Sequence, residues 1–165
     1  MPADPLADER LTTIGLFMEA HAGVTRELGR RLERDSGLPV QWFEVLLRLA
    51  RTPGGQLRMT DLAAQTILTP SGLTRVVDKL EDAGLVRRQS CASDRRGSFA
   101  TLTPKGRRRI EAAVPIHLGH INEVLTSALE PGDLEALSGL MRKLRDTFNP
   151  GAAAASTCPP LSSTA

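Results

Sequence analysis

Apolar residues recur at helical spacing in five stretches of this chain, and proline or glycine residues separate most of these stretches. Residues three and four apart lie on the same face of a helix, so each stretch predicts an amphipathic helix with one buried stripe. The predicted helices run from about 10 to 36, from Pro39 to Pro53, from Pro70 to Gly84, from Pro104 to the turn at 130–132, and from Asp133 to Phe148. Pro115 lies inside the fourth of these helices, where its missing N–H group should bend the helix.

The helix predicted between Thr69 and Gly84 has local causes at both of its ends. The Thr69 hydroxyl can cap the N-terminus, and Pro70 then occupies the first helical position, where its missing N–H group costs nothing. Gly84 can adopt the positive φ angle that ends a helix. The buried stripe consists of Leu73, Val76, Val77 and Leu80, and the opposite face carries Ser71, Thr74, Arg75, Asp78 and Lys79.

Two short extended segments, 85–89 and 98–102, follow this helix and flank a polar loop at 93–97. Thr103 and Pro104 then repeat the threonine–proline start of a helix. An arginine-rich hairpin beside a helix with hydroxyls and cations on its exposed face is typical of a winged helix that binds DNA. The helix would enter the major groove and the hairpin the minor groove, whose narrow, electronegative shape suits guanidinium groups.

The candidate DNA-binding residues are polar residues and one glycine of this helix and hairpin: Thr69, Ser71, Gly72, Thr74, Arg75, Lys79, Arg88, Asp94, Arg95 and Arg96. Taken alone, cations such as Arg75 and Lys79 are also typical of a solvated helix face. The hairpin favours the DNA interpretation, because two adjacent arginines at an exposed tip have no role in a core. Asp94 can hold an arginine side chain extended through a charge-assisted hydrogen bond.

The distribution of charge agrees with a DNA-binding centre. The whole chain has 21 basic and 19 acidic residues, a formal net charge of only +2. Residues 58–109 contain nine arginines and two lysines against five acidic residues, so 11 − 5 = +6, and the remainder carries 10 − 14 = −4. The attraction for phosphate is therefore concentrated in one part of the chain.

The chain resembles the MarR family of multiple-antibiotic-resistance regulators at 59–63, 80–86, 94–96 and 102–106. The resemblance covers most of residues 10–148 and implies a homodimeric winged-helix transcription regulator of bacteria. The family's Asp-any-Arg motif in the wing falls on Asp94 and Arg96. The resemblance thus implies that Arg96 enters the minor groove and that Asp94 orients it.

The predicted fold is mainly α with a small β wing: a winged helix-turn-helix over about 39–103, with long dimerisation helices over about 10–36 and 104–148. Residues 1–9 are expected to be flexible, and the uncharged Ala, Ser, Thr and Pro residues of 149–165 are expected to be disordered. The first helix has more apolar surface than a small core can cover, and a second copy of the chain would bury it. A two-fold dimer would set two recognition helices about one turn apart on a near-palindromic operator in double-stranded DNA.

Members of this family often bind a small anionic or aromatic molecule where the DNA-binding part meets the dimerisation helices. The resemblance implies His21, Trp42, His117 and His120 as candidate ligand contacts, although a core tryptophan and surface or interface histidines explain them as well. His117 and His120 lie three residues apart, and His21 could supply a third nitrogen, so a zinc-responsive regulator is an alternative. No cysteine or carboxylate strengthens that set, and we predict neither a bound metal nor a cofactor.

Other classes of protein are less consistent with the sequence. We expect no enzyme, because there is no Gly-rich phosphate loop, nucleophile elbow or His-Glu-x-x-His motif. The acidic start is no signal peptide and no apolar stretch approaches the roughly 18 residues of a membrane span, so we expect a cytoplasmic protein without a membrane partner. A winged helix used only for protein contacts is a further alternative, but this face has no exposed aromatics. The expected function is a homodimeric, sequence-specific repressor that a small ligand releases from DNA.

Overall fold

The structure is a computed structural model of the chain, and it describes residues 4–91 and 94–149. For residues 90, 91 and 94–97 the description covers the backbone alone. The segment predicted to be a disordered tail therefore lies outside the described residues, apart from Asn149. No helix of the described residues is long and apolar enough to cross a membrane.

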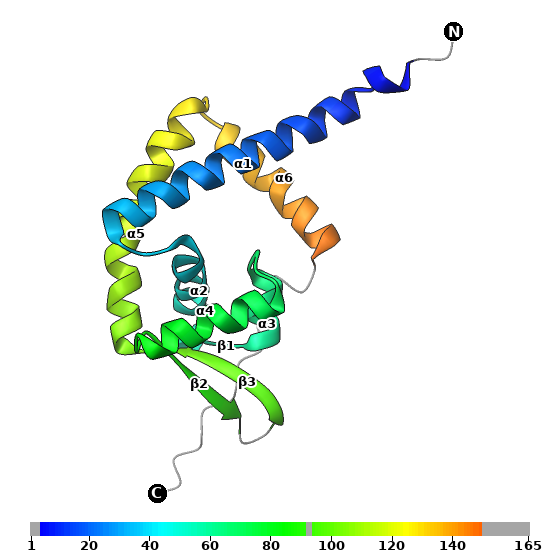
Figure 1. Cartoon of the computed structure of the whole chain (residues 1–165). Helices are drawn as coiled ribbons and strands as arrows, with labels where there is room; N and C mark the ends of the chain where they lie inside the picture. The colour runs from blue at the N-terminus through cyan, green and yellow to red at the C-terminus, as the bar shows by residue number, and fades with distance from the viewer. Residues whose placement is uncertain (1–3, 92–93, 150–165) are drawn as a thin grey trace, which may run out of the picture.

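Six α-helices and a small antiparallel sheet form the described part of the chain, which confirms the predicted fold class (Figure 1). The helices are α1 (Glu9–Ser36), α2 (Val40–Arg51), α3 (Met59–Gln65), α4 (Pro70–Asp82), α5 (Pro104–Val124) and α6 (Asp133–Phe148). The strands are β1 (Gln56–Arg58), β2 (Val86–Cys91) and β3 (Asp94–Leu102), in the order β1-β3-β2. Short 3-10 helices lie at Pro5–Ala7, Pro53–Gly55 and Thr126–Ala128.

The hydrophobic core lies where α2, α3 and α4 pack against the sheet. Leu46, Leu62, Val77 and Ala100 come from these four elements and are fully buried. Outside this unit, α1 contributes Leu32 near its C-terminal end, and α5 contributes its N-terminal half. We call residues 39–103 the winged-helix module, because they supply most of the core. The β2–β3 hairpin projects from it beyond α4 (Figure 1).

The local signals at helix ends work as predicted. The hydroxyls of Thr69 and Thr103 accept hydrogen bonds from the backbone N–H groups of Gly72 and Gly106, three residues further on. Gly84 has a φ of +70°, and the N–H of Leu85 reaches back to the Leu80 carbonyl at 2.9 Å. This left-handed residue with a six-to-one hydrogen bond stops α4 and turns the chain into β2.

The hairpin is longer than the sequence predicts. Residues 93–97 were expected to form a loop, whereas β3 begins at Asp94 and pairs with β2 through an irregularity at Ser90 and Cys91. Polar composition favours a loop, but a strand ladder depends on backbone hydrogen bonds that polar residues form equally well. Strand β1 was not predicted, because three residues carry too little pattern to identify a strand.

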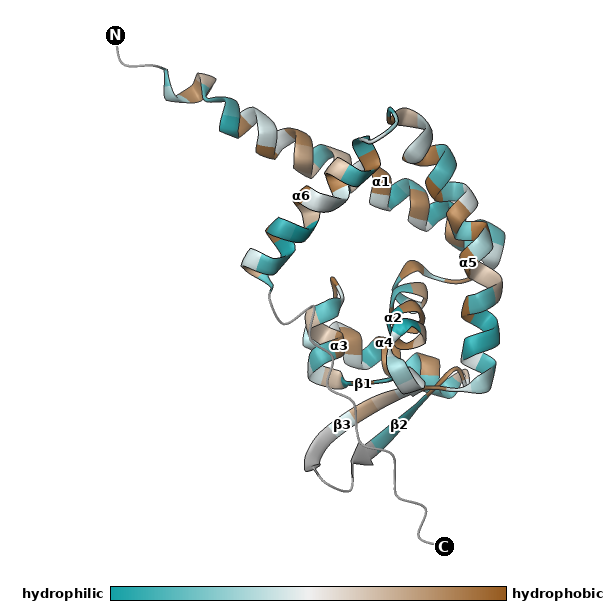
Figure 2. Cartoon of the chain, turned by 180° about the vertical axis from the view of Figure 1, so that it is seen from behind, coloured by the Kyte–Doolittle hydropathy of each residue, from teal (hydrophilic) through white to brown (hydrophobic). Residues whose placement is uncertain are grey.

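The last two helices begin where the sequence predicts, but the first of them is shorter than predicted. The sequence predicts one helix from Pro104 to the turn at 130–132, whereas α5 ends at Val124 and the 3-10 helix Thr126–Ala128 follows it. Gly132 occupies the cap position of α6 with a φ of +96°, and the Asp133 carboxylate accepts a hydrogen bond from the N–H of Glu130 at 2.8 Å, across the turn. Helix α5 continues through Pro115 and changes direction along its length, as predicted (Figures 1 and 2).

Large apolar side chains are exposed along the outer part of α1 and along α6. Helix α6 has no buried residue at all, and hydrophobic positions recur along both helices (Figure 2). The exposed large apolar residues of these two helices are Leu11, Ile14, Leu16, Phe17, Met18, Leu134, Leu140, Leu144 and Phe148. We call this surface the outer apolar surface.

Candidate nucleic-acid interface

The N-terminal end of α4 presents a row of exposed hydroxyl groups. The Thr69 hydroxyl caps the helix at 3.2 Å from the Gly72 nitrogen and lies 3.4 Å from the hydroxyl of Ser71. The hydroxyl of Thr74 donates to the Pro70 carbonyl at 3.0 Å. These side chains are exposed because the opposite face of α4, with Leu73 and Val77, is buried in the core.

Arg75 and Lys79 lie one helical turn apart on the same exposed face of α4. Neither side chain forms a hydrogen bond or an ion pair with any residue that the structure describes. Two unpaired cations beside the hydroxyl groups give this face the composition of a helix that contacts bases and phosphates.

Arg88 behaves differently from these two cations, although the sequence groups it with them as a DNA contact. Its guanidinium group lies 2.6 Å from the Asp78 carboxylate and donates to the Thr74 carbonyl at 3.1 Å. Its backbone N–H donates to the Glu81 carboxylate at 2.8 Å. Arg88 therefore joins strand β2 to helix α4.

The three charged residues predicted at the wing, Asp94, Arg95 and Arg96, lie where side chains are outside the description. The backbone places them at the start of β3, with Asp94 paired to Cys91 at the far end of the hairpin. In the sheet, β3 lies between β1 and β2, and the hairpin extends away from the helices of the module (Figure 1). Their contacts with DNA stay a prediction.

Several residues that support this face are not apparent from the sequence. The Lys105 ammonium group donates to the Ala83 carbonyl at 2.7 Å, and the Thr103 hydroxyl donates to the Gly84 carbonyl at 2.8 Å. Both side chains come from the start of α5 and satisfy carbonyl groups at the C-terminal end of α4. The Arg58 guanidinium group lies 5.4 Å from the centre of the Phe99 ring and joins β1 to β3.

Two of the four candidate ligand contacts come together on α5. The rings of His117 and His120 are 6.4 Å apart, and the His117 ring lies 4.6 Å from the ring of Phe43 on α2. Trp42 is half-buried against the core, and His21 lies exposed on α1 beside Phe17. The structure thus places a histidine pair on α5, with His117 against α2.

His120 is only 8% exposed, and its Nε2 atom lies 2.8 Å from the Asp35 carboxylate at the end of α1. The Arg34 guanidinium group, and then His120, lower the pKa of Asp35 to about 2. Burial, and then the neighbouring His120, lower the pKa of His117. The Nδ1 atoms of both histidines are buried and have no hydrogen-bond partner in the described part of the chain.

Among the described residues, no group of three or more His, Cys, Asp and Glu side chains could hold a metal ion. The zinc alternative thus has no support from the arrangement of His21, His117 and His120. The absence of an exposed aromatic cluster on α4 likewise leaves the alternative of a protein-only interface without support from the residues that the structure describes.

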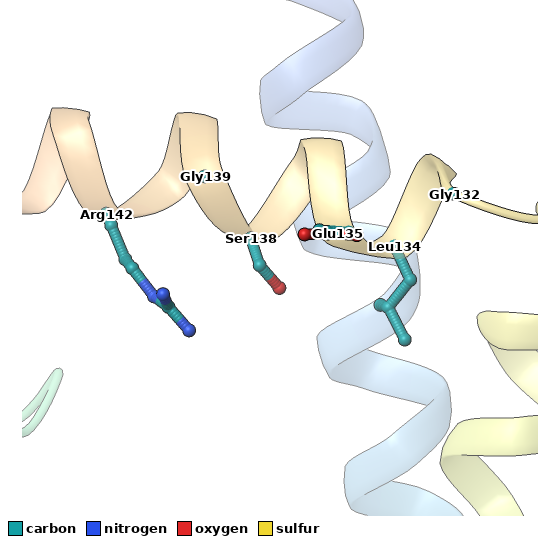
Figure 3. Close-up of a pocket in the computed structure, with 6 residues that line it drawn as sticks. All are labelled: Gly132, Leu134, Glu135, Ser138, Gly139 and Arg142. Carbon is teal, nitrogen blue, oxygen red and sulfur yellow. The ribbon is translucent and has the colours of Figure 1, made fainter.

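Two hollows lie on the outer helices. A groove of about 730 Å³ between α1 and α6 is lined by Arg10, Thr13, Ile14, Phe17, Leu140, Met141, Lys143, Leu144 and Phe148. A more polar hollow of about 700 Å³ lies along the first half of α6. Leu134, Ser138 and Arg142 point to the same side of this helix (Figure 3). The groove between α1 and α6 is part of the outer apolar surface.

Comparisons with known proteins identify relatives of this arrangement. The profile of the MarR family matches residues 36–97, from the end of α1 into the hairpin. The transcriptional regulator HosA of Escherichia coli is 30% identical over 105 residues, which cover 64% of this chain and 76% of HosA.

Two solved structures are similar as well. Sco3205, a MarR family transcriptional regulator from Streptomyces coelicolor solved in complex with DNA, has 34% identity and a TM-score of 0.76, covering 86% of this chain and 92% of that one. Bordetella bronchiseptica BpsR, whose DNA binding is regulated by 6-hydroxynicotinic acid, has 25% identity and a TM-score of 0.70, covering 82% of this chain and 99% of BpsR. Both likenesses span more than four fifths of this chain.

Proposed function

Because the chain belongs to the MarR family of transcriptional regulators, we propose that two copies bind one near-palindromic operator and repress the genes it controls. A small anionic or aromatic molecule then releases the dimer from DNA. The chain is a DNA-binding regulator and not an enzyme.

The exposed face of α4 is the observation that carries this proposal. Thr74, Arg75 and Lys79 lie opposite the buried stripe, and the β2–β3 hairpin projects beside them. A helix of this kind reads base edges in the major groove, while a basic hairpin reaches the adjacent minor groove. Sco3205, similar in both sequence and structure, was solved with DNA bound.

The outer apolar surface supports the homodimer. Phe17, Leu140 and Leu144 are between 40% and 56% exposed and line the groove between α1 and α6. An apolar surface of this extent is costly in water, and a second copy of the chain offers the matching surface. The two-fold axis of such a dimer would set the two α4 helices about one turn of DNA apart.

The DNA-binding proposal is tested by enriching duplexes from a random pool and titrating the enriched duplex with variants. Arg75→Ala and Lys79→Ala should each weaken binding to this duplex. The loss of a base contact should cost about 1–3 kcal/mol, and the loss of a phosphate contact should make the dependence of affinity on salt shallower. Arg26→Ala, the same loss of charge at an exposed position of α1, is the control and should bind like the wild type. Equal binding by all three variants would overturn the placement of the interface on α4.

The repressor assignment has its own test. A reporter gene whose promoter overlaps the enriched operator should be expressed less when the chain is present. Higher expression would instead identify an activator, and unchanged expression would overturn regulation through this operator.

The release by a small molecule rests on the region around His117 and His120. Neither buried Nδ1 atom of this pair has a hydrogen-bond partner among residues 4–91 and 94–149, and an acidic ligand could accept a hydrogen bond from one of them. BpsR, which shares the fold and 25% of the aligned residues, responds to an aromatic acid. The pair lies on α5, which joins the winged-helix module to the outer helices, so a ligand there could change the distance between the two α4 helices.

Fluorescence anisotropy with labelled operator tests this release. Aromatic carboxylic acids, beginning with 6-hydroxynicotinic acid and benzoic acid, are titrated into the protein–DNA complex. At least one acid should release the wild-type protein, and His117→Ala should raise the concentration required. A panel in which no acid shifts the binding curve would contradict this part of the proposal.

A further inference from the structure

Arg88 lies at the joint between the recognition helix and the wing. Its guanidinium group contacts both the Asp78 carboxylate and the Thr74 carbonyl, and its backbone N–H contacts Glu81. Thr74, Asp78 and Glu81 follow one another at spacings of four and three residues along α4. A single residue of β2 thus spans about two turns of one side of the helix.

The same residue is also fixed within the sheet. Arg88 pairs with Ala100 of β3, and Ala100 is fully buried in the core. A force on the Arg88 side chain is therefore passed to both strands of the hairpin. The direction in which the hairpin leaves the module depends on how this side chain is held.

Arg88 differs from the cations of the α4 face because its charge is paired with a carboxylate. Asp78 neutralises Arg88 at 2.6 Å, whereas Arg75 and Lys79 have no partner among the described residues. A paired arginine adds little to the attraction for phosphate. Its planar group can bond a carboxylate and a carbonyl at once, in a fixed geometry that the single ammonium group of lysine does not reproduce.

We propose that Arg88 is a positioning residue that fixes the wing relative to the recognition helix and does not itself contact DNA. Together with Asp78, it sets the angle at which helix and hairpin enter adjacent grooves. The specificity of DNA binding then depends on this ion pair, although neither member reads a base. The inference rests on the DNA-binding function proposed above and assigns a role within it.

Arg88→Lys and Asp78→Asn test the proposal, with Arg87→Lys as the matched control on the neighbouring residue of the same strand. Each protein is titrated against the enriched duplex and a scrambled duplex at several salt concentrations. Arg88→Lys keeps the charge, so binding to scrambled DNA and the salt dependence should stay unchanged, while specific binding falls by about tenfold. Asp78→Asn should also weaken specific binding, although it removes a negative charge. Arg87→Lys should bind like the wild type.

The alternative outcomes are distinct. If Arg88 contacts a phosphate, Arg88→Lys will retain specific binding and Asp78→Asn will bind both duplexes more tightly, and this result would overturn the proposal. If the pair only stabilises the fold, both variants will lose specific and non-specific binding in the same proportion, together with a lower unfolding midpoint, and the proposal would again be wrong. A wild-type chain that binds no duplex would overturn the proposed function itself.

A double-mutant cycle gives a second measurement. Arg88→Ala and Asp78→Ala should each reduce specific binding, and the double variant should lose no more than the larger of the two, because both changes break one contact. Losses that simply add would show that the two residues act independently and would overturn the joint role.

Discussion

The winged-helix module and the outer apolar surface are built in opposite ways. In the module, Leu46, Leu62 and Val77 have no exposed surface, and α4 is capped by the Thr69 hydroxyl at its start and closed by the backbone bond from Leu85 to Leu80 at its end. On the outer surface, Leu140 is 56% exposed and Phe148 is 82% exposed. A single copy of the chain therefore completes the part that reads DNA but leaves the part around α1 and α6 incomplete.

This difference separates two kinds of stability. The stability of the module comes from contacts within one chain and should not depend on protein concentration. In the proposed dimer, the stability of the outer helices comes from a second copy and should depend on protein concentration.

Leu46→Ala should have the largest effect, because it opens a cavity in the centre of the module. Truncation of a fully buried leucine costs about 2–5 kcal/mol. Urea unfolding followed by circular dichroism should show this loss, and the loss should be the same at low and high protein concentrations. A cost below about 1 kcal/mol would mean that Leu46 is not a core residue of the folded protein.

Two carboxylates on the outer apolar surface should dissociate the proposed dimer. Ile14→Asp combined with Leu144→Asp places two carboxylates at the groove between α1 and α6, where burial of an unpaired charge is strongly unfavourable. Sedimentation velocity should show dimers for the wild type and monomers of 17.8 kDa for the variant at micromolar concentration. The variant should also lose most of its operator affinity. Wild-type monomers, or a variant that still dimerises, would contradict the placement of the dimer contact.

Gly106→Ala should destabilise the joint between the module and α5. A Cβ atom at this position would lie 2.0 Å from the Leu85 carbonyl oxygen, and Leu85 is part of the core. Overpacking of this kind costs about 1–3 kcal/mol, or more where backbone must move. Gly119→Ala, on the same helix with open space around the position, is the control and should not reduce the free energy of unfolding. Equal stability of the two variants would show that α5 does not pack on Leu85 as described.

The smallest effect should come from the titration of His117. Its pKa in the fold lies below the ordinary value of 6.5, chiefly because of burial and secondly because of His120. The folded state therefore binds this proton less well than the unfolded state. The contribution of neutral His117 to the free energy of unfolding is fully present above pH 6.5 and is lost as the pH falls towards the lowered pKa. His117→Gln should lose less stability than the wild type between pH 7.5 and 5.5 in urea unfolding. A profile of His117→Gln that matches the wild type would contradict this assignment.

Local features of the fold are predictable from the sequence, whereas contacts between distant residues are not. The caps at Thr69 and Thr103 and the turn at Gly84 are decided within a few residues, so the helix ends of the module follow from the sequence. Asp35 and His120 are 85 residues apart in the sequence, and no sequence pattern predicts that they form a pair. Helical patterns also cannot show which copy of the chain covers an apolar stripe.

The candidate DNA-binding face shows the same division. Helical periodicity alone places Arg75 and Lys79 on the exposed side of α4, and the structure agrees. It cannot separate them from Arg88, because all three are arginines or lysines in a basic segment. Only the packing of β2 beside α4 shows that Asp78 neutralises Arg88, while the other two cations have no partner among the residues that the structure describes.

In the proposed dimer, each chain holds a complete DNA-reading module, and the two chains present these modules as a pair. Hydroxyl-radical footprinting of the wild-type protein on the enriched duplex shows whether both modules contact the DNA. We predict two protected half-sites related by two-fold symmetry. Their centres should lie one or two turns of DNA apart, where one turn is about 10–10.5 base pairs. A single protected half-site, or protection without symmetry, would contradict the account.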